Sequence, residues 1–314
     1  KPSKKKKGRW TKNDTELTVM ALPTTIWYIL FCFLPMFGLI IAFKNYKITG
    51  GKSFIYNLIH SEWAGVKNFM FLIKSNDLFV ILRNTILYNL VFIVLGMVVS
   101  VGLAIMISLM RNKRASKVYQ TMMFFPYFMS WVVASYFLDA FLNQDNGLIN
   151  SIMRNAGKEP IQWYMSAGVW PFILIFMYLW KSTGYNMVIY LSSISGIDTT
   201  LYEAAVMDGA NKRQQVWHIT LPCLKSVIIM MFILNVGKVF YSDFGLFFQL
   251  SQGASGSIFK TTATIDTYVY NALQSSTPIG MTSAATFFQS VACCITILLA
   301  NAIVKKIDED SAII

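Results

Sequence analysis

Charged residues are scarce in this chain of 314 residues, where Asp, Glu, Lys and Arg together make up 13% of the sequence. Hydrophobic residues account for 55%, with 24 phenylalanines among them, and the mean hydropathy is +0.51. So little charge beside so much apolar surface excludes an ordinary soluble globule. The composition therefore predicts an integral membrane protein.

Cysteine and histidine are also rare. The chain has no C-x-x-C spacing, and its few metal-binding side chains are Cys32, Cys223, Cys293, Cys294, His60 and His218. All four cysteines lie in or beside apolar segments, where a free cysteine acts as a small buried hydrophobe. We therefore expect no metal site.

Motifs for enzymatic chemistry are missing as well. Gly51-Lys52-Ser53 resembles the end of a P-loop, but the earlier glycine that this motif requires is Tyr46. The sequence shows no Ser-His-Asp arrangement and no carboxylate pair in a credible pocket. We expect no catalytic residues, no bound cofactor and no enzyme activity of the chain's own.

Long apolar segments are what the chain does contain. A helix needs roughly 20 apolar residues to cross the hydrocarbon core of a membrane. Continuous runs of this kind are unlike the short alternating strands of a membrane β-barrel, so all are predicted to be helices. Six segments meet or approach the required length: 17–43, 79–110, 117–141, 168–193, 223–245 and 281–304.

Basic residues gather at the ends of these segments and predict their orientation. Lysine and arginine are dense in residues 1–12 and 111–117, and they recur at 212–225 and 305–306. By the positive-inside rule these regions are cytoplasmic, so both termini lie inside. Five lysines in residues 44–77, which are placed outside, argue against this orientation.

The net charge of +12 is explained by topology and anionic-lipid contact, so no nucleic-acid partner is expected.

Three regions follow from this pattern. Residues 1–16 are predicted to be a basic cytoplasmic tail, 17–304 a six-helix transmembrane domain, and 305–314 a cytoplasmic C-terminal tail. The first apolar segment follows a basic stretch, as in a signal peptide. It is too long for one and has no small-x-small cleavage site after it, so we expect an uncleaved first span.

The hydrophilic loop 194–222, between the fourth and fifth segments, carries the most specific pattern. It reads Glu203-Ala204-Ala205, three residues, Gly209, nine residues, then Ile219-x-Leu221-Pro222. We expect a short surface helix over about 199–208, capped by Asp198 or by a capping box of Thr200 and Glu203. Leu201 and Tyr202 supply apolar contact on this helix, and its small alanines let another surface approach.

The rest of the loop predicts a turn and a second arm. Gly209 permits the backbone of a tight turn and ends the first helix. A second helical piece over about 211–220 is then expected, and Leu221-Pro222 should break it before the fifth span. The expected shape is a helix-turn-helix elbow.

The spacing of this loop resembles that of membrane subunits of bacterial binding-protein-dependent ABC importers. Nearly the whole chain resembles the permease subunits of maltose-type carbohydrate importers, in their polysaccharide and oligosaccharide branch. Supporting phrases are Phe33-Leu34-Pro35-Met36-Phe37-Gly38, Leu82-Arg83-Asn84-Thr85, Phe125-Pro126-Tyr127-Phe128-Met129-Ser130-Trp131-Val132-Val133 and Leu299-Ala300-Asn301. One departure is Asp198, where many sugar permeases carry proline.

The resemblance implies an all-α, type I importer permease in a bacterial cell membrane. Its expected partners are a second, different permease, two ATPase subunits that hold ATP and Mg²⁺, and a lipid-anchored or periplasmic solute-binding protein that delivers an oligosaccharide. The elbow would act as a coupling helix on one ATPase. The residues expected to carry this coupling are Glu203, Ala204, Ala205, Asp208, Gly209, Ile219, Leu221 and Pro222.

Polar and ionisable side chains inside the spans are candidates for a substrate pathway, because such groups usually face the bundle interior or water. In the fourth segment Tyr178, Lys181 and Tyr185 share a helical face. In the fifth, Asn235, Lys238 and Ser242 are expected to do the same, with Tyr241 and Asp243 adjacent. Alternatively, the lysines snorkel to the membrane surface or pair with Asp243. The tyrosines would then belong to the belt of aromatic residues at the membrane interface. Two lysines would suit an acidic glycan such as a uronate oligomer.

Three other functions remain open at this point. An ABC permease for a non-sugar solute shares the elbow. A secondary transporter has intramembrane charges without needing the elbow. A structural or signalling subunit of the membrane is the third.

Overall fold

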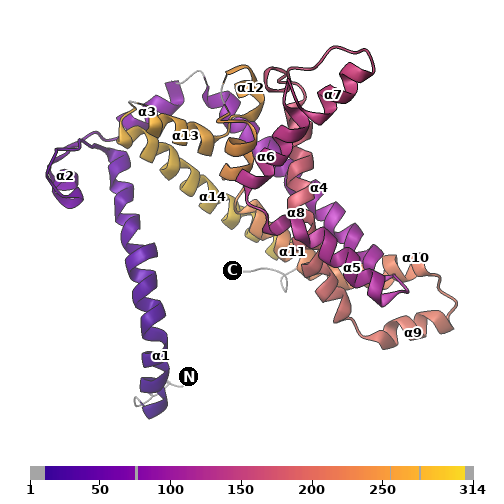
Figure 1. The fold of residues 1–314 in the computed structure, drawn as a ribbon. Helices are drawn as coiled ribbons and strands as arrows, with labels where there is room; N and C mark the ends of the chain where they lie inside the picture. Colours follow the sequence, from indigo (N-terminus) through magenta and orange to yellow (C-terminus); the bar gives the residue numbers. More distant parts are fainter. Residues whose placement is uncertain (1–10, 75–76, 255, 276, 308–314) are drawn as a thin grey trace. The chain divides into compact units, whose positions relative to one another are not determined.

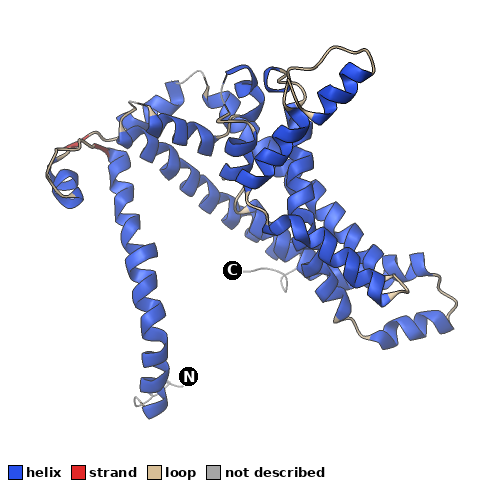
Figure 2. Cartoon of the chain, viewed as in Figure 1, coloured by secondary structure: helices blue, strands red, loops and turns tan. Residues whose placement is uncertain are grey.

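The structure is a computed structural model that describes residues 11–74, 77–254, 256–275 and 277–307. These residues are mainly helical, with one antiparallel pair of two-residue strands (Figure 2). The predicted all-α class is confirmed. Most of the predicted tails, 1–16 and 305–314, lies outside the described residues. The chain divides into one compact unit of Lys1–Phe71 with Pro278–Phe287, and another of Leu72–Thr277 with Phe288–Ile314.

The first unit begins with a continuous helix from Lys12 to Phe43. It consists of α1 (Lys12–Tyr28), a π-helical turn (Ile29–Phe33) and a 3₁₀ segment (Leu34–Phe43). The helix starts before the predicted residue 17, because Thr11 and Asp14 form a capping box: the Asp14 carboxylate accepts from Thr11 N at 2.8 Å. The first predicted span is thus helical.

Short elements follow this helix: β1 (Lys44–Asn45), α2 (Phe54–His60), β2 (Glu62–Trp63) and α3 (Lys67–Lys74). In the strand pair Lys44 lies opposite Trp63. The Asn68 amide holds the end of the long helix, since Nδ2 donates to Ala42 O and Lys44 O, both at 2.9 Å.

The second unit holds the other spans and the predicted loop (Figure 1). Its first elements are α4 (Leu78–Ser108), α5 (Lys113–Phe124), a 3₁₀ turn (Phe125–Phe128), α6 (Trp131–Leu142), α7 (Leu148–Asn155), a 3₁₀ turn (Trp163–Met165) and α8 (Trp170–Ser195). Then come α9 (Thr199–Met207), α10 (Lys212–Gln215), a π turn (Val216–Thr220) and α11 (Leu221–Val236). The chain ends with a π turn (Gly245–Gln249), a 3₁₀ turn (Gly256–Ile258), α12 (Phe259–Thr262), α13 (Ile265–Gln274) and α14 (Ile279–Ile307), whose first residues belong to the first unit.

Five continuous helices among the described residues are long and apolar enough to cross a membrane, and a sixth span is formed if one bent pair counts as one. That pair is the predicted span 117–141, which bends by 99° between Lys113–Phe128 and Trp131–Leu142. The predicted fifth span, 223–245, is also displaced: its helix runs from Lys212 to Val236. The predicted span, which the sequence already marks as the most interrupted of the six, is helical only in part, because the α-helix ends at Val236.

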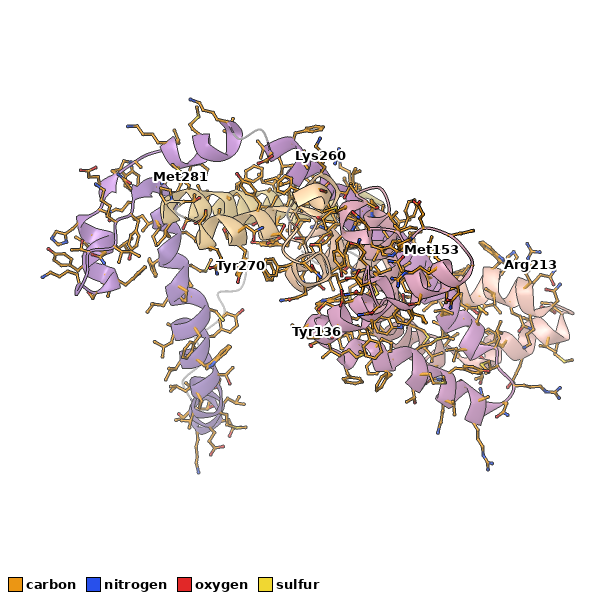
Figure 3. The ribbon with its side chains drawn as sticks, turned by 45° about the horizontal axis from the view of Figure 1, so that its top comes forward. Tyr136, Met153, Arg213, Lys260, Tyr270 and Met281 are labelled. Atoms are coloured by element: carbon orange, nitrogen blue, oxygen red, sulfur yellow. The ribbon has the colours of Figure 1, made fainter. Side chains whose placement is uncertain are left out.

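Two buried clusters hold the second unit together. One joins α4, α6, α8 and the segment 246–258 around Phe92, Trp170 and Phe247; the other joins α4, α8 and α11 around Met187, Tyr190 and Leu224. Many side chains project outward from the helices (Figure 3). Large apolar ones are among the exposed residues, for example Leu87 and Val98 on α4. An apolar exterior around a packed interior is the pattern that lipid as a solvent requires.

Candidate functional site

The predicted elbow is present, and its first arm is α9. The Asp198 carboxylate caps this helix by accepting from Thr200 N at 2.9 Å. Hydrogen bonding from the backbone N–H of Thr200, and also from its side chain, holds the pKa of Asp198 below its usual value. Thr200 itself lies inside the helix, so the predicted capping box with Glu203 is wrong: the aspartate took the capping position two residues earlier.

The turn after α9 is a complete Schellman motif. Ala210 N donates to Ala205 O at 2.8 Å and Gly209 N donates to Val206 O at 3.0 Å, which satisfies carbonyls that the helix end leaves free. Gly209 has φ +78, a conformation that a side chain disfavours. The predicted role of Gly209 in ending the helix is therefore confirmed.

The second arm starts at Asn211, which forms a capping box with Gln214. The arm does not end at Leu221-Pro222 as predicted, because the helix is continuous from Lys212 to Val236. In a regular α-helix a proline ring clashes with the carbonyl four residues earlier. The π turn Val216–Thr220 directly before Pro222 changes which carbonyl faces the ring. The elbow therefore continues as one helix into the membrane span.

A hydrogen bond joins the two arms. Tyr202 OH lies 2.9 Å from Thr220 Oγ1, 18 residues further along the chain, and Thr220 is 4% exposed. The arms are thus linked at a buried point. A displacement of α9 is expected to move the helix that follows.

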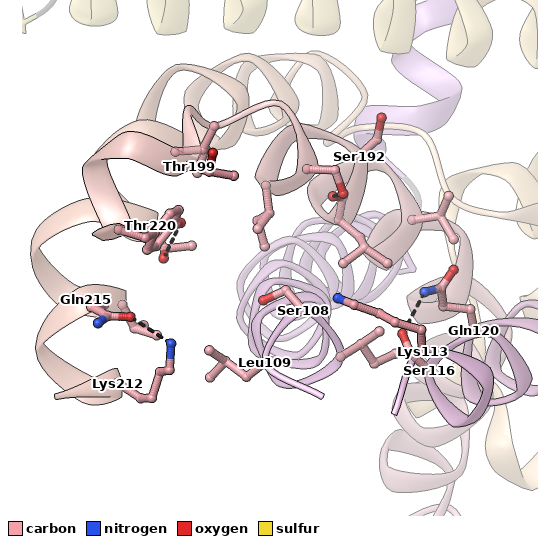
Figure 4. A pocket seen from close by; sticks show the side chains of 18 of the residues that line it. Ser108, Leu109, Lys113, Ser116, Gln120, Ser192, Thr199, Lys212, Gln215 and Thr220 are labelled. Carbon is pink, nitrogen blue, oxygen red and sulfur yellow. Dashed lines mark hydrogen bonds between the residues drawn. The ribbon is translucent and has the colours of Figure 1, made fainter. Parts of the chain in front are cut away.

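The two faces of α9 differ in their surroundings. Leu201, Ala204 and Met207 are exposed and lie on one side of the helix by its 3.6-residue period. Thr199 and Tyr202 lie on the other side and line a cavity of about 590 Å³ (Figure 4). Of the predicted coupling residues, those on the surface are Glu203, Ala204, Asp208, Gly209 and Pro222, and those half-buried are Ala205, Ile219 and Leu221.

A second candidate site lies where two spans break. The bend after α5 frees the carbonyl of Tyr127, and Lys181 Nζ on α8 donates to that oxygen at 2.8 Å. The same ammonium lies 5.3 Å from the Tyr127 ring centroid and 5.2 Å from that of Trp131, within cation–π distance. Tyr185 stacks on Tyr127 with centroids 4.5 Å apart. Lys181 thus supplies a hydrogen-bond donor to the carbonyl that the helix break leaves free, while its charge stays beside a group of aromatic rings.

The break after α11 faces the same group. Trp131 Nε1 donates to Asp243 Oδ2 at 2.8 Å, and Asn89 on α4 donates to the carbonyls of Val239 and Tyr241 at 3.0 and 2.8 Å. Irregular backbone at membrane depth must have such partners, and it occurs where it is buried in protein or lines a water-filled cavity. Broken helices of this kind mark the binding sites of many transporters.

The predicted pathway residues divide into several environments. Tyr178, Lys181 and Tyr185 share α8 as expected, but Tyr178 stacks on Phe92 at 4.0 Å, against the buried core. The predicted common face of Asn235, Lys238 and Ser242 is wrong, because the helix ends at Val236.

Each of the other candidates has its own setting. Ser242 Oγ donates to Asp266 at 2.7 Å, Tyr241 OH lies 2.9 Å from Ser290 Oγ, and Lys238 is exposed. No ion pair joins either lysine to Asp243 within the described parts of the chain; the indole of Trp131 contacts both Lys181 and Asp243 instead.

Sequence reasoning missed Asn89, Tyr127 and Trp131 as members of this site. Asn89 is a polar residue inside an apolar span, and that signal was available. Tyr127 and Trp131 stood out only as part of a family phrase. Among the described residues, no group of three Asp, Glu, His or Cys side chains is placed to hold a metal ion.

Residues 100–309 match the family of binding-protein-dependent transport system inner membrane components. The chain is 33% identical to the polygalacturonan/rhamnogalacturonan transport system permease protein YteP of Bacillus subtilis, over 94% of this chain and 89% of that protein. It is 31% identical to protein LplB of the same organism, over 95% of this chain and 91% of that protein.

Solved structures give the same picture of the fold. A bacterial ABC transporter involved in the import of the acidic polysaccharide alginate matches with TM-score 0.83 and 27% identity, covering 95% of this chain and 97% of that chain. A bacterial alginate ABC transporter in complex with an alginate pentasaccharide-bound periplasmic protein matches with TM-score 0.82 and 28% identity, covering 94% and 96%. The fold is that of a type I importer permease.

Proposed function

The chain belongs to the family of binding-protein-dependent transport system inner membrane components, and from this we propose that it forms half of the pathway of an ATP-driven oligosaccharide importer. The observation that carries the proposal is the elbow: a capped surface helix with an exposed apolar face, locked by a Schellman turn and continuous with a membrane span. The chain is a transport subunit of the inner membrane. ATP and Mg²⁺ would be held by separate ATPase subunits.

Movement of the ATPases would be transmitted through the elbow and the helix that continues from it. The exposed face of α9, with Leu201, Ala204 and Met207, would sit in a groove of the ATPase. The Tyr202–Thr220 contact would carry a movement of α9 into the helix Lys212–Val236. That helix ends at the break beside Asp243, so closure of the ATPases would reach the site where cargo passes.

The cargo would be an oligosaccharide with acidic residues. Aromatic rings pack on the apolar faces of sugars, and an ammonium attracts carboxylates. Lys181 with Tyr127, Trp131 and Tyr185 brings an ammonium and aromatic rings together in one place. The named functions of the similar proteins, which concern polygalacturonan, rhamnogalacturonan and alginate, support the same substrate class.

We also propose the rest of the assembly. A second, different permease would complete the pathway, two ATPases would bind below, and an extracytoplasmic binding protein would deliver the glycan. Both termini would be cytoplasmic, with 1–16 and 305–314 as tails of the transmembrane domain 17–304. A non-sugar permease, a secondary transporter and a signalling subunit are the outcomes to be excluded.

Purification of this chain from cells that also produce the proposed partner subunits tests the proposal. We expect an ATPase to copurify, and its hydrolysis rate should rise when binding protein loaded with an acidic oligosaccharide is added. Empty binding protein is the control. Absence of an ATPase, or hydrolysis that no loaded binding protein stimulates, would overturn the proposed function.

A further inference from the structure

A large, half-open cavity lies on the inner side of the elbow. It measures about 590 Å³, within the range of roughly 300–1,000 Å³ typical of small-molecule sites. Its walls come from the end of α4, one face of α5, the last turns of α8 and the elbow itself (Figure 4). It therefore lies between the membrane bundle and the segment proposed to contact the ATPase.

Positive charge dominates the polar part of its walls. Lys113 and Lys117 lie on the face of α5, and Lys212 lies on the elbow; no lining residue carries a carboxylate. In Figure 4, Lys113 and Lys212 reach into the cavity from opposite sides. A ligand that neutralises both ammonium groups would join α5 to α10. An anion is the complementary occupant.

Buried side chains hold the polar groups in place. Gln215 is 3% exposed; its Oε1 accepts from Lys212 Nζ at 3.1 Å while its Nε2 donates to Ala210 O at 3.1 Å. An ammonium has three donors, so Lys212 keeps two for a ligand. On the facing wall Gln120 Nε2 donates to Ser116 Oγ at 3.1 Å, and Ser116 is buried. The lysine of the elbow is thus oriented before any ligand binds.

Aliphatic side chains also line the cavity, beside serines of the same helix ends. Among the aliphatic residues are Ile107, Leu191 and Ile194, from the ends of α4 and α8. These residues end two membrane spans, so the cavity lies at the level of lipid headgroups. A site that combines cations with aliphatic groups fits an amphiphile whose polar end is anionic.

We propose that this cavity binds a phosphate-bearing anion, with an anionic phospholipid as its source, and that the bound phosphate fastens the elbow to α5. The proposal rests on the proposed function for the role of the elbow, but the binding itself does not. Contacts to Lys113 and Lys212 together would restrict α9 and α10 relative to the bundle. Anionic lipid would thereby raise the fraction of ATP hydrolysis that drives transport.

Native mass spectrometry of the detergent-solubilised importer tests the binding, with phosphatidylglycerol, phosphatidylcholine and inorganic phosphate as separate probes. We expect phosphatidylglycerol to be retained over phosphatidylcholine. Lys113→Gln and Lys212→Gln should each weaken retention about fivefold, as expected for one ammonium near a headgroup. Lys113→Arg should retain binding, which separates loss of charge from misfolding.

Arg114→Gln is the matched control, because Arg114 also lies on α5 and does not line the cavity. Equal weakening by Arg114→Gln, or no effect of either lysine variant, would overturn the site. If inorganic phosphate binds with the same lysine dependence and phosphatidylglycerol does not, the phosphate site stands and its source is soluble. Binding in an importer whose ATPase ignores the loaded binding protein would support this site while contradicting the proposed function.

Discussion

Trp131 and Asp243 lie 112 residues apart and meet through a hydrogen bond of 2.8 Å from the indole Nε1 to Oδ2. The bond joins the two breaks in the membrane helices, one after the Lys113–Phe128 segment and one after α11. Lys181 lies 5.2 Å from the same indole ring. One side chain therefore contacts both the positive and the negative charge of the proposed cargo site.

Removing the donor while keeping an aromatic ring tests this contact. Trp131→Phe should lower the initial rate of ATP-driven uptake about fivefold, since a hydrogen bond to a charged group contributes on the order of 1 kcal/mol or more. Acidic and neutral oligosaccharides should be affected alike, because the position of the backbone changes. Uptake at the wild-type rate would show that the two breaks do not depend on this bond.

Lys181 is expected to act through its charge as well as through its donor. Lys181→Gln keeps an N–H group for Tyr127 O but removes the charge, so uptake of an acidic oligosaccharide should fall roughly tenfold while that of a neutral one is retained. Lys238→Gln is the control, because Lys238 is exposed beyond the end of α11. Equal losses for both cargoes would assign Lys181 a purely structural role.

Gly184 lets α5 and α8 approach closely. A β-carbon there would lie 1.8 Å from Met123 O, whereas one at Gly102 on α4 would have no heavy atom within 4 Å. Gly184→Ala should destabilise the protein by about 1–3 kcal/mol, as overpacking does, and lower its thermal unfolding temperature in detergent. Gly102→Ala should leave that temperature nearly unchanged. Equal shifts would contradict the helix contact.

Replacing either of two buried threonines by valine is expected to have opposite effects on stability. Thr85 Oγ1 donates to Ile81 O at 2.7 Å and accepts from Ile265 N at 3.0 Å; the Thr183 hydroxyl has no partner among the described residues. Thr85→Val leaves a buried N–H unsatisfied and should cost about 1–3 kcal/mol. Thr183→Val loses no bond and should be neutral or stabilising. Thermal unfolding of the two variants side by side gives the answer.

The sequence was sufficient to locate the elbow because its chemistry is local. Spacing placed Gly209 at the turn, and φ +78 confirms why glycine stands there. Capping rules offered Asp198 and Thr200 as alternatives, and only the structure distinguished them. The rule for proline predicted a break at Pro222, yet the π turn before it lets the helix continue. Such a compensating turn has no simple sequence signature.

The helix breaks could not be predicted, because distant residues stabilise them. Hydropathy marks residues 117–141 as an apolar segment and 223–245 as the most interrupted of the six, but it does not show where either helix breaks. A helix break is tolerated in a membrane when each freed carbonyl accepts a hydrogen bond. Lys181 donates to the carbonyl of Tyr127, and Asn89 donates to that of Tyr241. They lie 54 and 152 residues away along the chain. Local pattern carries no information about such pairs.

The ratio of oligosaccharide transported to ATP hydrolysed, measured in proteoliposomes without ion gradients, tests the central claim that α9 couples the ATPases to this chain. Gly209 has open space around it, so a substitution acts through its backbone alone. Gly209→Asn tolerates positive φ and should keep the ratio near wild type, whereas the β-branched Gly209→Val should reduce it severely while the complex still assembles. Unchanged coupling in Gly209→Val, or uptake without ATP, would contradict the account.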